Sequence, residues 1–186
     1  MSLKELTAER HKSAERSDFV KVLFSGRIDP FFYATFLANQ HPMYQMLEVC
    51  ANRHDLLNGL PDIYRSKAIY SDLFELTDNN SKKTTILPIV KEYNEHILNL
   101  SNTNSKLLFA HIYVRHMGDL FGGQMIAKKV PGSGKFYQFD NPDELKLAIR
   151  ERLDDSLAEE ANVCFDFAIK LFQQLMELEI PKYKDE

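Results

Sequence analysis

Apolar side chains recur every three or four residues along most of this 186-residue chain, and no stretch alternates apolar with polar residues over a useful length. Spacing near 3.6 is typical of amphipathic α-helices, whereas a half-buried strand needs spacing of two. No internal repeat or long linker divides the sequence. We therefore expect an all-α protein of about seven or eight helices, forming a single domain over residues 1–186.

Capping residues predict where several helices begin and end. Residues 2–25 open with an S-x-x-E capping-box pattern and stop before a glycine. Asp29 and Pro30 fit the N-cap and first position of the next helix, and Pro42 predicts a kink inside it. The pattern of residues 61–80 predicts one or two short helices that end in a polar turn.

Composition excludes several classes of protein. The chain is 44% hydrophobic and 27% charged with a net charge of −4, which does not favour a general nucleic-acid or anionic-membrane surface. No apolar run reaches the length of a membrane span, and the N-terminus lacks a secretory core. Cys50 and Cys164 lie in apolar helical contexts without CxxC spacing, so we expect buried free thiols. These features predict a cytoplasmic protein without a membrane partner.

A glycine-rich stretch, HMGDLFGGQ at residues 116–124, interrupts an otherwise apolar helix. Gly118, Gly122 and Gly123 together forgo about 2–3 kcal/mol of helix stability relative to alanine. Three explanations stay open: close packing of two helices, a kink or hinge, and close approach of a flat ligand. Asp119 favours the ligand, because a carboxylate in so apolar a segment is costly without a partner or a task. No strand or GK[ST] ending supports a phosphate loop.

The N-terminal segment LTAERHKSAER places His11 and Glu15 four residues apart, on one face of a helix. A carboxylate can hold one ring nitrogen and leave the other free to bind a metal. The alternative is a histidine on a charged surface. The six histidines show no zinc-type spacing, so a site built from several of them is not predicted.

At this point the residues resemble a known family. YVRHMGDLFGGQ resembles the distal-helix motif of the biliverdin-producing heme oxygenases, LTAERHKSAE their proximal-histidine helix, and EEANVCFDFAIKLFQQL their C-terminal helix. The match runs in order along nearly the whole chain. The short form looks most like the soluble members from cyanobacteria and their phages. The resemblance implies a helical fold that holds heme between a proximal and a kinked distal helix.

The resemblance also implies roles on both sides of the heme. His11 would be the proximal iron ligand, with Glu15 holding its other nitrogen. Gly118 and Gly122 would lie against the heme on the distal side, and Gly123 would complete a flexible segment there.

On the distal side, Asp119 would organise a water network that supplies protons. Arg115, Tyr113 and Tyr44 match family positions that support this network.

Basic residues would meet the heme propionates. Lys146 and Arg150 match a basic pair of the family, and Lys4 would contribute from the proximal helix. A further basic residue, often found three positions before the histidine, is Ala8 here. Phe172 would pack near the macrocycle.

The implied reaction converts heme to biliverdin, carbon monoxide and ferrous iron with O2, so heme b would be both cofactor and substrate. Electrons must come from outside, because no flavin, nicotinamide or iron–sulfur motif is present; ferredoxin is the expected donor. A downstream bilin reductase could receive the product.

Three other classes stay open. A heme carrier or sensor would keep His11 and the glycines without turnover. A thiamin-degrading enzyme of the wider helical superfamily would need a reactive cysteine, whereas Cys164 looks like part of the core. A structural module would use the glycines for packing alone.

Overall fold

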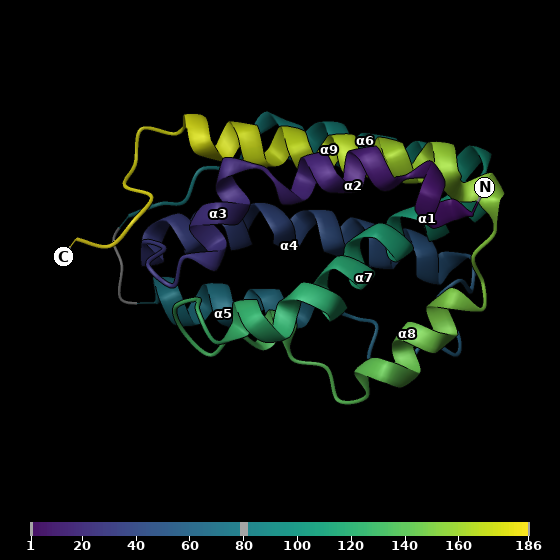
Figure 1. Cartoon of the computed structure of the whole chain (residues 1–186), viewed down its shortest axis with the longest axis horizontal. Helices are drawn as coiled ribbons and strands as arrows, with labels where there is room; N and C mark the ends of the chain where they lie inside the picture. The colour runs from purple at the N-terminus through teal and green to yellow at the C-terminus, as the bar shows by residue number, and fades with distance from the viewer. Residues whose placement is uncertain (1, 79–81, 186) are drawn as a thin grey trace.

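The computed structural model describes residues 2–78 and 82–185, which fold into nine α-helices and three short 3₁₀ segments (Figure 1). The α-helices are α1 (Leu3–Leu6), α2 (Ala8–Glu15), α3 (Asp18–Phe24), α4 (Pro30–Arg53), α5 (Ser66–Thr77), α6 (Pro88–Thr103), α7 (Leu108–Ala127), α8 (Pro142–Arg150) and α9 (Ala158–Glu177). The 3₁₀ segments are η1 (Ser105–Leu107), η2 (Lys135–Tyr137) and η3 (Asp155–Leu157). The predicted fold class is confirmed, although the expected count of seven or eight helices was too low. Part of the predicted polar turn, residues 79–81, lies outside the described residues.

The extra helices arise at the N-terminus, where residues 2–25 divide into α1, α2 and α3. The capping pattern is present, because the Ser2 backbone N–H donates to Glu5 Oε2 at 2.7 Å. Thr7 joins α1 to α2. Ser17 has an extended backbone, and its hydroxyl accepts a hydrogen bond from Val20 N at 3.3 Å, so it caps a new helix. The sequence pattern missed this second serine cap.

The predicted start of α4 is confirmed. Asp29 Oδ1 accepts hydrogen bonds from Phe31 N at 2.8 Å and Phe32 N at 3.0 Å, and Pro30 occupies the first helical position. The helix continues through Pro42 to its end, so the proline does not terminate it.

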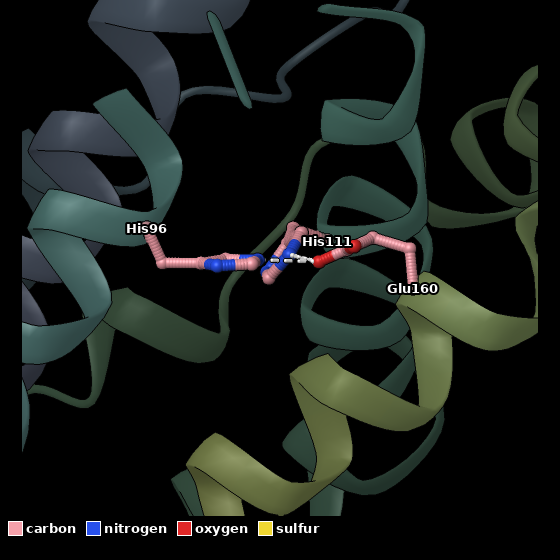
Figure 2. Close-up of side chains that lie close together, drawn as sticks. All are labelled: His96, His111 and Glu160. Carbon is pink, nitrogen blue, oxygen red and sulfur yellow. Dashed lines mark hydrogen bonds and ion pairs between the residues drawn. The ribbon is translucent and has the colours of Figure 1, made fainter. Parts of the chain in front are cut away.

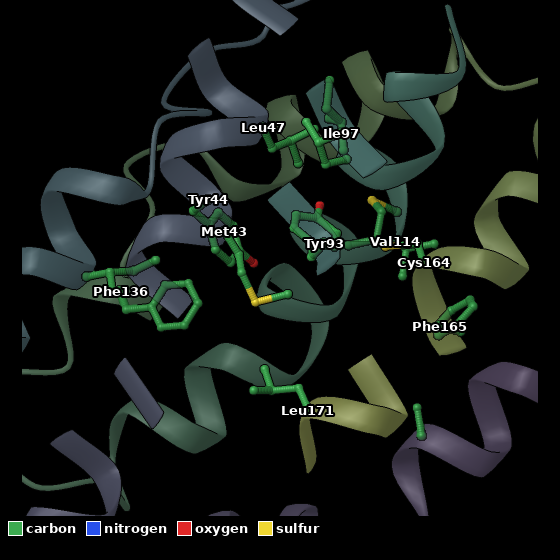
Figure 3. Close-up of a cluster of buried hydrophobic side chains, with 14 of the residues drawn as sticks. Met43, Tyr44, Leu47, Tyr93, Ile97, Val114, Phe136, Cys164, Phe165 and Leu171 are labelled. Atoms are coloured by element: carbon green, nitrogen blue, oxygen red, sulfur yellow. The ribbon is translucent and has the colours of Figure 1, made fainter. Parts of the chain in front are cut away.

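Helices α4 and α9 organise the core. α4 contacts α5, α6 and α7, and α9 contacts α2, α3, α6 and α7, whereas α8 packs beside α7 (Figure 1). Buried side chains from these helices meet in one cluster (Figure 3). It includes Met43, Tyr44, Leu47, Tyr93, Ile97, Val114, Phe136, Cys164, Phe165 and Leu171. Two polar clusters described below are built on this packed frame.

Two further predictions concern the cysteines and membrane spans. Cys50 and Cys164 are both free and buried, as expected. Over residues 2–78 and 82–185, none of the helices combines the length and the apolar character that a membrane crossing requires.

Candidate functional site

Asp119 and Tyr44, 75 residues apart in sequence, form a hydrogen-bonded pair between α7 and α4. The Tyr44 hydroxyl donates to Asp119 Oδ2, and the Tyr44 ring is 1% exposed. Edge-on contacts with Phe136 and His116, at centroid distances of 5.4 and 5.6 Å, fix that ring in place. The carboxyl of Asp119 is therefore held at a defined position on α7.

Burial raises the pKa of Asp119 to about 7, although the Tyr44 hydrogen bond and the nearby Arg115 charge both act to lower it. A carboxyl with such a pKa is present in both protonation states near neutral pH. It can therefore accept and release a proton under ordinary conditions.

Arg115 supports the pair from the same helix. Its Nε donates to the Tyr93 hydroxyl at 3.0 Å, and its Nη1 donates to Gln40 Oε1 at 2.9 Å. The guanidinium lies 4.9 Å from the centroid of the Tyr44 ring and 4.4 Å from that of Tyr93. Arg115 thus stabilises the ring whose hydroxyl holds Asp119.

The three glycines of α7 have different surroundings. A methyl group added at Gly118 would meet no atom within 4 Å, and at Gly122 it would meet Phe24 Cζ at 3.7 Å, an ordinary contact. At Gly123 it would lie 3.0 Å from two atoms of the buried Tyr137. The packing explanation therefore holds for Gly123, whereas Gly118 leaves a bare surface next to Asp119 and Gly122 has room for no more than a methyl group.

His11 lies on α2 with an exposed side chain. Its Nε2 is 3.5 Å from Glu15 Oε1, so the predicted pair is formed. The ring packs edge-on against Phe165 of α9 at 5.6 Å. Lys4, on α1, is also exposed. Both α2 and α7 pack on α9, so His11 and the glycine surface belong to helices that share one neighbour.

The predicted basic pair of α8 lies beside α7. Lys146 Nζ is 5.0 Å and Arg150 Cζ 5.6 Å from the centroid of the Phe121 ring, which immediately precedes Gly122. Phe172 stacks on Phe19 at 5.0 Å, on the face of α9 that meets α3.

Tyr113 is half-buried on α7 and packs against the core. Three residues were expected to support Asp119. Tyr44 and Arg115 contact each other, and Tyr44 bonds Asp119, whereas Tyr113 packs against the hydrophobic core.

A second polar cluster joins three helices at the other end of α7: His96 of α6, His111 of α7 and Glu160 of α9 (Figure 2). Glu160 Oε1 contacts the Nε2 atoms of His96 at 2.6 Å and His111 at 2.8 Å. These hydrogen bonds lower the pKa of Glu160 to about 2 even though burial opposes them. Burial lowers the pKa of His111 to about 4. The carboxylate is therefore ionised and His111 neutral at pH 7.

These three side chains have the composition of a metal site, with ligand atoms within 4.8 Å of one another. The hydrogen bonds argue for a structural role instead. Since Glu160 accepts from both Nε2 atoms, both carry hydrogen, and metal binding would move the His111 proton to Nδ1. His111 Nδ1 is buried without a partner among the described residues, so an N–H there would stay unsatisfied.

The sequence pattern missed several of these residues. Tyr93 and Gln40 had no local signal, although a buried arginine must find partners. Phe121 was visible in the sequence between Gly118 and Gly122, but its contact with Lys146 and Arg150 was not predicted. Glu160 and its two histidines are scattered over 65 positions and meet only through packing.

The reactive thiol of the thiamin-degrading alternative is not present at Cys164. This cysteine is 2% exposed, and burial raises the pKa of its thiol to about 12. A thiol with so high a pKa is not a nucleophile at neutral pH.

A family model for heme oxygenase matches residues 1–174. The heme oxygenase of Rhodella violacea is 32% identical, over 94% of this chain and 86% of that protein. The solved heme oxygenase of Leptospira interrogans is 27% identical with a TM-score of 0.78, over 94% of this chain and all of that one. Heme oxygenase-1 of Synechocystis, solved in complex with heme, has a TM-score of 0.79 at 24% identity, over 93% of this chain and 90% of that one, which shows a shared fold.

Proposed function

Because this chain belongs to the heme oxygenase family, we propose that it cleaves heme to biliverdin, carbon monoxide and ferrous iron, using O2 and electrons from an external donor. The observation that carries this proposal is the Asp119 carboxyl, which Tyr44 holds beside the bare surface at Gly118. A heme carrier or sensor needs no acid with a pKa near 7 at that position. The match over residues 1–174 supports treating the chain as one heme oxygenase domain.

The described residues fit a heme group. When bound, heme b supplies both the iron that activates O2 and the ring that is cut, so it is cofactor and substrate. His11 would bind the iron through an imidazole that is already exposed, with Glu15 limiting its rotation. Gly118 leaves room for a flat ligand, because an added methyl group there would meet no atom within 4 Å, and Gly122 extends this face with a methyl-sized space that ends at Phe24.

The heme carboxylates would be met by Lys146 and Arg150 of α8, with Lys4 contributing from α1. All three have basic side chains, and those of Lys146 and Arg150 lie together beside α7. Phe172 would pack near the macrocycle from α9.

The protein's own contribution to the chemistry is placement and protons. Asp119 would hold a proton at its carboxyl and pass it to the reaction through ordered water, and its pKa of about 7 allows reloading from solvent. Tyr44 orients the carboxyl, and Arg115 fixes Tyr44. Tyr113 would support the same water network.

The electron donor, the enzyme that receives the product and the cellular location remain predictions. Ferredoxin is the expected donor because the sequence carries no redox motif of its own, and a bilin reductase would consume the product. A cytoplasmic location is supported by two buried cysteines kept as free thiols.

The test is a spectroscopic titration followed by turnover. Hemin added to the protein should give a Soret band typical of histidine ligation, and ferredoxin, its reductase and NADPH should replace that band with the broad red absorption of biliverdin. His11→Ala should remove the histidine-ligated spectrum. A Soret band stable to the reducing system would identify a carrier or sensor, and no Soret shift would overturn the proposal.

A further inference from the structure

Phe121 is an aromatic side chain that α7 leaves 57% exposed, between two glycines that carry no side chain at all. Single exposed apolar residues are common on protein surfaces and need no explanation by themselves. What distinguishes Phe121 is that both cations of α8 converge on its ring. Lys146 Nζ lies 5.0 Å and Arg150 Cζ 5.6 Å from the ring centroid.

Both distances are within the range in which a cation is attracted to the face of an aromatic ring. The two contacts restrict two long side chains that would otherwise sample many rotamers in solvent. The Lys146 side chain is only 19% exposed, so most of its length packs against neighbouring residues. Phe121 thus gives the basic pair a preferred place next to the bare surface of α7.

The structure also shows that a cation on this ring can bind a carboxylate. While Lys146 Nζ lies over Phe121, it forms an ion pair with Asp143 Oδ1 at 3.2 Å, one turn earlier in α8. The Asp143 side chain is 97% exposed and reaches the lysine from solvent. The ammonium therefore binds a carboxylate while its contact with the ring stays intact.

We propose, on the premise that the chain binds heme as described above, that Phe121 is a positioning residue for the heme carboxylates. Its ring holds Lys146 and Arg150 where they can receive two carboxylates without first losing rotamer freedom. The two α8 cations are two of the three residues proposed to meet the heme carboxylates, and Lys4 on α1 is the third.

The test compares hemin binding by Phe121→Leu and by a matched control. Met125 lies on the same helix, is 58% exposed and has no part in the cation cluster, so Met125→Leu makes an equivalent change to the surface. Without the ring, Lys146 and Arg150 would lose their rotamer freedom only when hemin binds, so Phe121→Leu should bind hemin roughly fivefold to 100-fold more weakly. Met125→Leu should bind like the unaltered protein, and Phe121→Tyr, which keeps the ring face, should restore binding.

A second ligand separates positioning of the cations from simple apolar contact. Hemin dimethyl ester has the same macrocycle without the carboxylate charges, so Phe121→Leu should bind it as well as the unaltered protein does. An equal loss for hemin and its diester would show that the ring is only an apolar wall, and unchanged hemin affinity would also overturn the inference. Failure of the unaltered protein to bind hemin would instead overturn the proposed function, and this inference with it.

Discussion

Each half of α7 lies beside one carboxyl group, and the pKa values of these two groups are shifted in opposite directions. Near the N-terminal half, Glu160 of α9 accepts hydrogen bonds from two histidines, and its pKa is lowered to about 2. In the C-terminal half, Asp119 has one hydroxyl donor, and burial raises its pKa to about 7. Burial and the number of donors together decide the outcome, because burial penalises the charged form and each donor stabilises it.

This difference distinguishes a carboxylate that holds helices together from a carboxyl that can exchange its proton. Glu160 is fully committed to joining α6, α7 and α9, and it stays ionised across the physiological range (Figure 2). Asp119 lies beside glycines that leave space open and keeps its proton exchangeable. One helix therefore combines a half that Glu160 anchors and a half that we propose receives the heme.

The largest effect is expected at the exchangeable carboxyl. Asp119→Ala should retain hemin binding but lower the rate of biliverdin formation by about 100-fold or more, because a positioned proton donor typically contributes that much. Single-turnover absorbance with excess reductant measures the rate. Asp119→Asn, which keeps an acceptor for Tyr44, should be as impaired. Unchanged biliverdin yield in either variant would contradict the proton-supplying role.

Removing the fixed carboxylate should affect folding rather than chemistry. Glu160→Gln leaves both histidines without an anionic acceptor, and we expect the free energy of unfolding to fall by about 2–4 kcal/mol. Urea denaturation with an unchanged m-value measures the loss.

The control for Glu160→Gln is turnover per folded molecule, which should stay close to that of the unaltered protein. A loss of turnover as large as that of Asp119→Ala, without loss of stability, would erase the distinction between the two halves.

The two carboxyls should also give opposite dependences of stability on pH. Asp119 has a folded pKa above its ordinary 3.8, so the folded state holds the extra proton between about 4 and 7, and the free energy of unfolding falls as pH rises through that range. Glu160 has a folded pKa below its ordinary 4.5, so its stabilisation is present above that value and is lost as pH falls toward 2.

Denaturation at a series of pH values separates these contributions. Asp119→Asn should gain stability relative to the unaltered protein as pH rises, whereas the deficit of Glu160→Gln should shrink at acid pH. His111, with its pKa lowered to about 4, adds to the loss at acid pH. Parallel pH profiles for both variants would show that the two carboxyls do not differ as described.

The smallest effects concern the glycines. Gly118→Ala should raise the free energy of unfolding by about 0.8–1 kcal/mol, because the methyl group meets nothing within 4 Å and alanine favours helix. The same variant should bind hemin more weakly if that surface receives the ligand.

Gly123→Ala is the matched control in the same helix. Its methyl group would lie 3.0 Å from Tyr137, so it should lower stability by about 1 kcal/mol or more. Equal effects of the two substitutions on stability would remove the distinction between bare and packed glycines.

Local rules in the sequence determined most of the helices and their limits. Helical periodicity excluded a sheet, Asp29 and Pro30 marked the start of α4, and the resemblance in residues 113–124 pointed to the family. These features depend on neighbouring residues, so spacing and capping chemistry suffice. The break before α3 was missed because Ser17 is a weak signal inside a charged helical segment.

Only the tertiary structure decided which side chains act together. Tyr44 reaches Asp119 across 75 positions, and Glu160 joins two histidines from other helices, because α4 and α9 pack against α7. Packing likewise turned Gly123 toward Tyr137 and left Gly118 bare. Burial and the number of hydrogen-bond donors then set the opposite pKa values, and both quantities are properties of the assembled fold rather than of any local stretch.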